Sequence, residues 1–133
     1  MKNDASSAAK MAVMLLCLST AITSCDNYKE PEPVETHYVN LTELNRDTIV
    51  SVANDKLSNS VSLVMEGSIS KLAILKFSND TSFAEKSGIA LAPGTLSSTP
   101  FSLGDFAGER LYIQYLPLSD STSGTIKIGV VFQ

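Results

Sequence analysis

The chain has 133 residues, of which 44% are hydrophobic, and it carries a formal net charge of −4 at pH 7. This length accommodates one domain. The 10 basic side chains are scattered singly rather than gathered into a stripe, which excludes the electrostatic footprint of a nucleic-acid-binding protein, so no nucleic acid partner is expected.

The first 24 residues predict a secretory signal peptide. A lysine-containing start, MKNDASSAAK, precedes the apolar run MAVMLLCLSTA, and small residues follow at the expected cleavage point. The apolar run is too short to cross a hydrocarbon core about 30 Å thick as a helix. Removal of residues 1–24 would leave an exported mature chain with a net charge of −5, because Lys2, Lys10 and Asp4 leave with the signal.

The signal ends at Ile22-Thr23-Ser24-Cys25, which resembles the lipobox of bacterial lipoproteins. The resemblance implies that Cys25 is acylated and becomes the first residue of the mature chain, held in the membrane by two or more lipid chains. Cys17 follows two bulky leucines, which do not suit the cleft of a signal peptidase. The alternative is a plain signal peptide that is cleaved near Ser24 and leaves Cys25 unmodified.

Residues 25–36 predict a lipidated cysteine followed by a solvated tether. The run DNYKEPEPVET is acidic, contains two prolines and offers few groups that a core could bury. Acidic residues just after a lipidated cysteine resemble the export signal of Bacteroidetes lipoproteins. That resemblance implies an outer-membrane lipoprotein at the cell surface, with the periplasmic face as the alternative location. No disulfide is expected in the mature chain, since Cys17 is removed and Cys25 is capped.

Residues 37–133 predict an all-β domain. Short runs rich in Val, Ile, Leu, Tyr and Thr alternate with clusters of Gly, Ser, Asn, Asp and Pro, and no segment keeps a helical period. Gly67-Ser68 is expected to form a tight hairpin turn between the third and fourth strands. The expected strands lie at 38–41, 48–52, 61–67, 72–77, 89–91, 100–103, 110–116 and 124–132.

The expected strand at 72–77 is apolar on both faces, which indicates a central strand. One antiparallel sheet cannot bury both faces, so a second sheet is expected to pack over it. The sequence therefore predicts an antiparallel two-sheet sandwich of seven or eight short strands, immunoglobulin-like in general form. Three phenylalanines in loops or at strand ends are expected to plug its core: Phe83, Phe101 and Phe106.

The last third, GERLYIQYLPLSDSTSGTIKIGVVF, resembles the closing hairpin of small uncharacterised Bacteroidetes β-sandwich lipoproteins. This segment and that hairpin share a tyrosine-rich strand, a proline, a Ser/Thr-rich turn and a terminal strand. The resemblance implies a fold and a setting in the cell envelope, and it transfers no site residues.

The residue inventory predicts a non-enzymatic protein with no cofactor and no metal. His37 is the single histidine, and the mature chain has no free thiol, so the usual zinc sites and a Ser-His-Asp triad are not expected. We expect His37 to be solvated or to start a strand. The acids of the domain fall at expected turns or strand ends, where soluble β proteins carry solvated charges: Glu66, Asp80, Glu85, Asp105, Glu109 and Asp120.

Two functions stay open at this point. The first is an interaction, adhesion or assembly module of the envelope that is anchored by lipid. The second is a glycan-binding accessory lipoprotein of a polysaccharide-uptake system, in which Tyr112 faces outward with Gln114 beside it and contacts a sugar. The alternative for Tyr112 is a cross-strand pair on a solvated face.

Two tripeptides resemble the Bacteroidetes O-glycosylation motif, an acid followed by a hydroxyl residue and a small or aliphatic residue. Asp120-Ser121-Thr122 lies in an expected exposed loop and would be modified at Ser121. Asp47-Thr48-Ile49 lies in an expected strand, where a glycan on Thr48 would have to point outward.

Overall fold

The computed structural model describes residues 29–84 and 87–133. The predicted signal peptide and the lipobox Ile22-Thr23-Ser24-Cys25 therefore lie outside the described residues. Residues 29–35 are exposed and have no regular secondary structure. Residues 34–133 form a compact unit.

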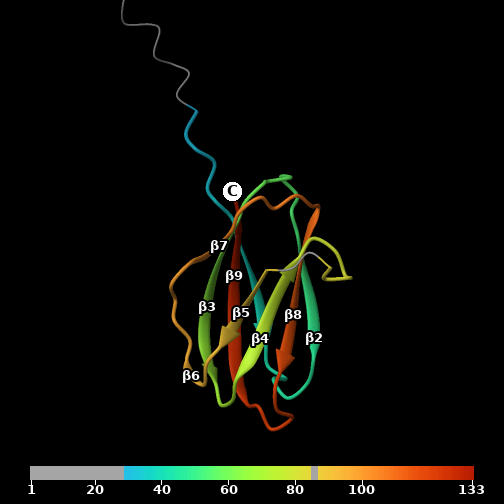
Figure 1. Ribbon diagram of the computed structural model, residues 1–133. Helices are drawn as coiled ribbons and strands as arrows, with labels where there is room; N and C mark the ends of the chain where they lie inside the picture. Colours follow the sequence, from blue (N-terminus) through green and yellow to red (C-terminus); the bar gives the residue numbers. More distant parts are fainter. Residues whose placement is uncertain (1–28, 85–86) are drawn as a thin grey trace, which may run out of the picture. The chain divides into compact units, whose positions relative to one another are not determined.

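Nine strands are found among the described residues of this unit, each antiparallel to its neighbours (Figure 1). They are β1 (Thr36–Leu41), β2 (Thr48–Ala53), β3 (Val61–Ile69), β4 (Ala73–Ser78), β5 (Ser87–Leu91), β6 (Gly94–Thr95), β7 (Phe101–Leu103), β8 (Arg110–Pro117) and β9 (Gly124–Phe132).

The strands form two sheets, which confirms the prediction of an antiparallel two-sheet sandwich. The first sheet has the order β1-β9-β3-β6, with β7 also pairing with β3, and the second has the order β2-β8-β4-β5. Most successive strands alternate between the sheets, and the first and last strands are neighbours. This interleaved order is that of a double-sheet jelly roll, a detail that the sequence did not specify.

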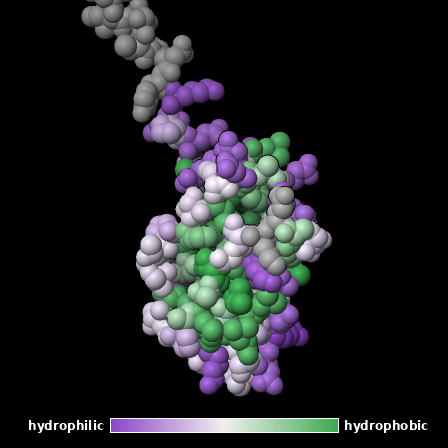
Figure 2. All heavy atoms as spheres, in the orientation of Figure 1, coloured by the Kyte–Doolittle hydropathy of each residue, from purple (hydrophilic) through white to green (hydrophobic). Residues whose placement is uncertain are grey.

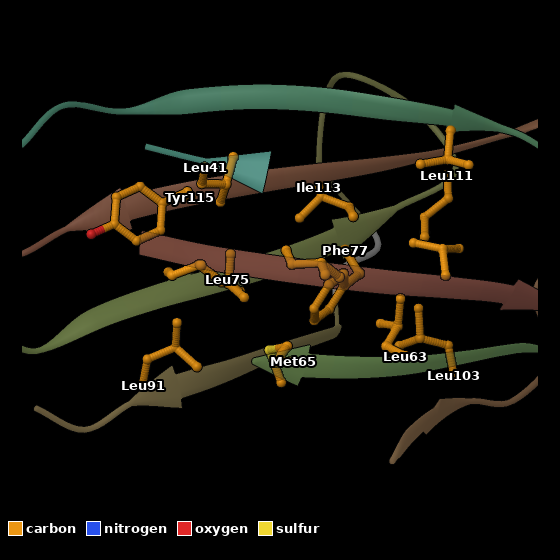
Figure 3. Packing of buried hydrophobic residues seen from close by; sticks show 14 of the residues in the cluster. Leu41, Leu63, Met65, Leu75, Phe77, Leu91, Leu103, Leu111, Ile113 and Tyr115 are labelled. Atoms are coloured by element: carbon orange, nitrogen blue, oxygen red, sulfur yellow. The ribbon is translucent and has the colours of Figure 1, made fainter. Parts of the chain in front are cut away.

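The core lies between the two sheets and takes every second residue of the long strands (Figure 3). Phe83 and Phe106 are buried and Phe101 packs against the core, which confirms their prediction as core residues. Each large apolar side chain that is fully buried contributes about 1.5–3 kcal/mol. The most deeply buried ones come from both sheets: Val61, Leu63, Leu75, Leu111, Ile113, Tyr115, Ile126, Ile128 and Val130.

β4 occupies an inner position between β8 and β5, as predicted for a central strand. Its inward residues, Ala73, Leu75 and Phe77, are buried. The expectation that its other face is also buried is wrong, because Ile74 is half-buried and Leu72 just before the strand is 43% exposed. The apolar character of this outer face is therefore not explained by core packing.

The predicted hairpin turn at Gly67-Ser68 is wrong. β3 continues through Ile69 and pairs with β9 along nine residues, while β4 belongs to the other sheet. Gly67 has a φ of 122° and lies against the backbone of β9, so it serves a close approach of two strands rather than a turn. β8 and β9 also lie in different sheets, so the closing segment is a crossover and not a hairpin.

Tyr115 joins β8 to the loop between β1 and β2. Its side chain is fully buried, and its hydroxyl donates a 3.0 Å hydrogen bond to the backbone oxygen of Leu44, which is also buried. Burial raises the pKa of Tyr115, because the ionised phenolate would lose its hydration. His37, expected to be solvated or to start a strand, lies in β1 with its ring 6.0 Å from that of Phe132.

Candidate binding site

Tyr112 lies on the outer face of the β2-β8-β4-β5 sheet, which confirms the prediction that it turns away from the core. The burial of β8 alternates along the strand, with Leu111 and Ile113 buried and Tyr112 half-buried. Its directly opposed residues are Ser51 on β2 and Ser78 on β4. Because both neighbours are small, no bulky cross-strand partner stands opposite the ring.

Tyr112 also lines a hollow of about 610 Å³, which we call the Tyr112 hollow. The hollow lies where β2 ends and β8 begins, at the end of the sandwich that carries the 54–60 loop, at the top of Figure 1. Three separate segments contribute to it. The lining residues are Ala53, Asn54, Asp55, Leu57, Asn79, Glu109, Arg110 and Tyr112.

Asn54 fixes one wall of the hollow. Its side chain is buried, and Nδ2 donates to the backbone oxygens of Ser58 at 2.8 Å and Gly108 at 2.9 Å. Its Oδ1 accepts from the Ser58 amide at 3.0 Å, and its own amide donates to Glu109 O at 2.8 Å. These bonds hold Leu57 in the left-handed region with a φ of 51° and its side chain 71% exposed.

Asn79 also lines the hollow. Its Nδ2 donates a 2.9 Å hydrogen bond to the backbone oxygen of Ala107. Asp80 follows and closes a tight turn. The Ser82 hydroxyl, the Ser82 amide and, to a lesser degree, the Phe83 amide donate to its carboxylate and lower the pKa of Asp80, against an opposing effect of desolvation. Asn79 is thus presented from an ordered turn.

The Tyr112 hollow combines the groups that carbohydrate recognition uses. The Tyr112 ring and the Leu57 side chain offer apolar surface, while Asp55 and Glu109 are exposed carboxylates. Arg110 donates from Nη1 to Ser51 Oγ at 3.1 Å. No group of three or more His, Cys, Asp or Glu that could hold a metal is found in residues 29–84 and 87–133.

Gln114, predicted beside Tyr112, shares the outer face but does not line the hollow. It lies between Ile49 on β2 and Lys76 on β4. The residues that complete the hollow, Asp55, Leu57 and Asn79, come from loops whose meeting point leaves no sequence motif.

The two predicted glycosylation residues differ in placement. Ser121 is exposed in the loop after β8, with its hydroxyl 2.9 Å from that of Ser119. Thr48 is half-buried at the start of β2, on the side of the strand that Val50 and Val52 turn toward the core. A glycan on Thr48 would have to leave from that side, so the geometry suits modification of Ser121 better.

A second feature of the same sheet is an apolar surface at its opposite end, which we call the outer patch: Ile49, Leu72, Ile74, Leu116 and Leu118. Leu116 and Ile74 are cross-strand partners, and Leu118 donates its amide to Leu72 O at 3.2 Å. Leu72, Ile49 and Leu118 are 43%, 51% and 59% exposed. Figure 2 shows hydrophobic residues gathered over the lower part of this face, where β4 and β8 lie.

The outer face of the other sheet is more polar. Glu66 stands opposite Lys127, whose Nζ lies 4.2 Å from the centre of the Tyr38 ring. Tyr38 itself is 60% exposed and faces Gly129 on β9. Apolar surface is therefore concentrated on the β2-β8-β4-β5 sheet.

Comparisons with known proteins leave the function open. No family model and no curated protein matches the sequence. A designed double-stranded β-helix covers 74% of this chain and 99% of its own, with 15% identity and a TM-score of 0.34. A mitogen derived from Yersinia pseudotuberculosis covers 76% and 86%, with 10% identity and a TM-score of 0.38. A Desmodium yellow mottle tymovirus chain covers 77% and 88%, with 13% identity and a TM-score of 0.28.

Likenesses this distant carry no argument about partners or activity. In the part of the chain that the structure describes, no helix is long and apolar enough to span a membrane.

Proposed function

We propose that the protein is a lipid-anchored, non-enzymatic interaction module of the bacterial outer membrane, placed at the cell surface or on the periplasmic face. The outer patch is the observation that carries this proposal. Three large aliphatic side chains, Ile49, Leu72 and Leu118, are at least 43% exposed beside the half-buried Ile74 and Leu116. A contiguous apolar surface of this kind is typical of a protein contact.

The position of the patch supports a protein partner. The chain leads into β1 at Thr36, which pairs with Val131 near the end of β9. The patch lies at the other end of the sandwich, beyond the start of β4 and the end of β8. Within the sandwich, the patch therefore lies at the end opposite to Thr36, where the chain enters β1.

We expect the double variant Leu72→Asp, Leu118→Asp to lose its partner. Each leucine contributes roughly 1.5–3 kcal/mol when it is fully buried, so binding should weaken at least tenfold. A photo-crosslinking residue at Ile49 of the full-length protein in its native cells should yield a crosslinked protein in the parent and not in the double variant. The crosslinked protein, identified by mass spectrometry and purified, should bind the parent directly.

Ser68→Asp is the matched control, because Ser68 is exposed on the outer face of the other sheet. This variant should keep the crosslink at full intensity. Equal crosslinking in the parent and the double variant would contradict the assignment of the patch as the contact surface.

A second candidate function is glycan binding, supported by the grouping of Tyr112 with Leu57, Asp55 and Asn79 around one hollow. A ring that stacks on the apolar face of a sugar, with carboxylates and amides beside it to bind hydroxyls, is a common solution to carbohydrate recognition. The hollow is within the range of 300–1,000 Å³ that is usual for small-ligand pockets.

If the Tyr112 hollow binds glycans, Tyr112→Ala should weaken this binding about tenfold or more, because the stacking surface is lost. Isothermal titration calorimetry against a panel of soluble polysaccharides measures the effect. Tyr38→Ala is the control, since Tyr38 is an exposed tyrosine on the other sheet. Unchanged binding by Tyr112→Ala, or an equal loss in Tyr38→Ala, would count against the Tyr112 hollow as the glycan site.

A further inference from the structure

A second hollow of about 310 Å³ lies at the same end of the sandwich, and we call it the Asp105 hollow. Buried residues of the core form its base, among them Phe106 and Leu111. Its polar groups come from three places in the chain: Ser78 and Asn79 at the end of β4, Ser87 at the start of β5, and Asp105 after β7.

The two hollows adjoin. Asn79 lines both of them. Ser78, which lines the Asp105 hollow, is the cross-strand partner of Tyr112, which lines the other. Residues 103–107 line the Asp105 hollow and Glu109 and Arg110 line the Tyr112 hollow, with only Gly108 between these two stretches of the chain. Asn79 is therefore common to both hollows, and a ligand that extends past it would contact both of them.

Ala107 and Gly108 link the lining residues of the two hollows, and we call this segment, together with the adjoining Asn79, the ridge; side-chain hydrogen bonds hold it in place. Asn79 Nδ2 donates to Ala107 O at 2.9 Å, and Asn54 Nδ2 donates to Gly108 O at 2.9 Å. Gly108 packs so closely that a Cβ at that position would lie 2.9 Å from the Cβ of Asn79. Because the ridge is already ordered, binding of an extended ligand carries no further entropic cost for ordering it.

The ridge also retains hydrogen-bonding capacity. An asparagine amide has two donor hydrogens and an acceptor oxygen, and the bond to Ala107 uses one of the donors. Asn79 can therefore bind hydroxyl groups of a ligand that crosses it. The exposed Ser87 hydroxyl and Asp105 carboxylate are further polar groups of the Asp105 hollow.

The charges of the joined surface define the ligand class. Three carboxylates, those of Asp55, Glu109 and Asp105, line the two hollows, against the single guanidinium of Arg110 among the described lining residues. An excess of negative charge repels uronic acids, sulfates and phosphates. Uncharged sugars, by contrast, bind carboxylates and amides through their hydroxyl groups.

We propose that the Tyr112 hollow and the Asp105 hollow form one extended site for an uncharged oligosaccharide that crosses the ridge at Asn79. One sugar unit lies against Tyr112, and the following units extend toward Asp105. This inference rests on the glycan-binding candidate function and adds the length and the charge of the ligand to it.

The test is a titration of residues 26–133 by calorimetry with malto-, cello-, laminari- and manno-oligosaccharides of one to six units. This segment contains the whole core, so it is suitable for solution work. For whichever of these four oligosaccharide series binds, the affinity should rise at least tenfold between a chain of one sugar unit and a chain of four. Oligogalacturonides of the same lengths should bind at least tenfold more weakly than the neutral ladder.

Two groups of variants locate the ligand. Tyr112→Ala should weaken binding of every length. Asp105→Gly and Ser87→Ala should weaken binding of the longer chains at least fivefold and leave the shortest that binds unchanged. Glycine suits the φ of 51° at residue 105, so Asp105→Gly removes the carboxylate without adding backbone strain.

Affinity that does not depend on length, or long-chain binding that both Asp105→Gly and Ser87→Ala leave intact, would overturn the extended site while leaving glycan binding at Tyr112 in place. Binding of oligogalacturonides as tight as that of the neutral chains would overturn the proposed charge class. Absence of binding to every ladder and to the polysaccharide panel would instead overturn the glycan-binding function, and the extended site with it.

Discussion

The Cys25→Ala variant of the full-length chain is expected to move from the membrane fraction to the soluble fraction of its native host. Each methylene of a buried acyl chain contributes about 0.8 kcal/mol, and two or more chains make attachment stable. Since the alanine side chain cannot form the thioether, the whole of this contribution is lost at once. Detergent extraction, ultracentrifugation and immunoblotting of the fractions measure the shift.

Cys17→Ala is the matched control, because the same substitution eight residues earlier spares the lipobox. It should leave the protein in the membrane fraction. Mass spectrometry of the native protein should show an N-terminal Cys25 with fatty acids attached. A Cys25→Ala protein that stays in the membrane, or a mature chain that begins at another residue, would contradict the proposed anchor.

The sandwich could be predicted because alternation is a local property. In β8, Leu111, Ile113 and Tyr115 point inward while Tyr112 and Gln114 point outward, and the structure confirms this pattern residue by residue. The ends of the main strands are likewise marked by Gly, Ser, Asn, Asp or Pro clusters. Strand existence and orientation therefore follow from neighbouring residues.

The pairing of the strands could not be predicted, since it joins segments that are distant in the sequence. β1 and β9 are the first and last strands, yet they are neighbours in one sheet. Gly67 shows the difficulty at a single residue. A glycine after an alternating run is typical both of a hairpin turn and of a close approach between strands, and only its partner on β9 distinguishes the two.

In the Tyr112 hollow, the sequence predicted the position of Tyr112 but not the loop residues that surround it. Alternation placed Tyr112 outside the core, but Asn79 and Asp55 reach it from loops 33 and 57 residues earlier in the chain. The outer patch could not be predicted from the sequence for a different reason. The apolar residues on both faces of β4 were attributed to burial, whereas one of these faces is open to solvent.

The second large effect is expected at Gly67, where alanine should destabilise the fold by roughly 2–6 kcal/mol. A φ of 122° is strained for any residue with a side chain, which costs on the order of 1–3 kcal/mol. In addition, a Cβ at this position would collide with the backbone oxygen of Thr125 on β9, and overpacking of this kind costs roughly another 1–3 kcal/mol.

Two other glycines separate these contributions. Gly94 has a φ of 118° but no atom within 4 Å of its Cβ position, so Gly94→Ala should show the backbone strain without the collision. Gly104 has neither a positive φ in this range nor a close neighbour, so Gly104→Ala should change stability by less than about 0.5 kcal/mol. Urea unfolding of residues 26–133, followed by circular dichroism, measures all three.

The expected order of unfolding free energies is Gly104→Ala highest, then Gly94→Ala, then Gly67→Ala. This order tests the strand pairing itself, because the collision at Gly67 exists only if β3 runs past this residue alongside β9. In a hairpin at Gly67-Ser68, the residue would sit at an exposed turn and its Cβ would meet solvent. Equal destabilisation by Gly67→Ala and Gly94→Ala would therefore argue for that turn and against the continuous strand.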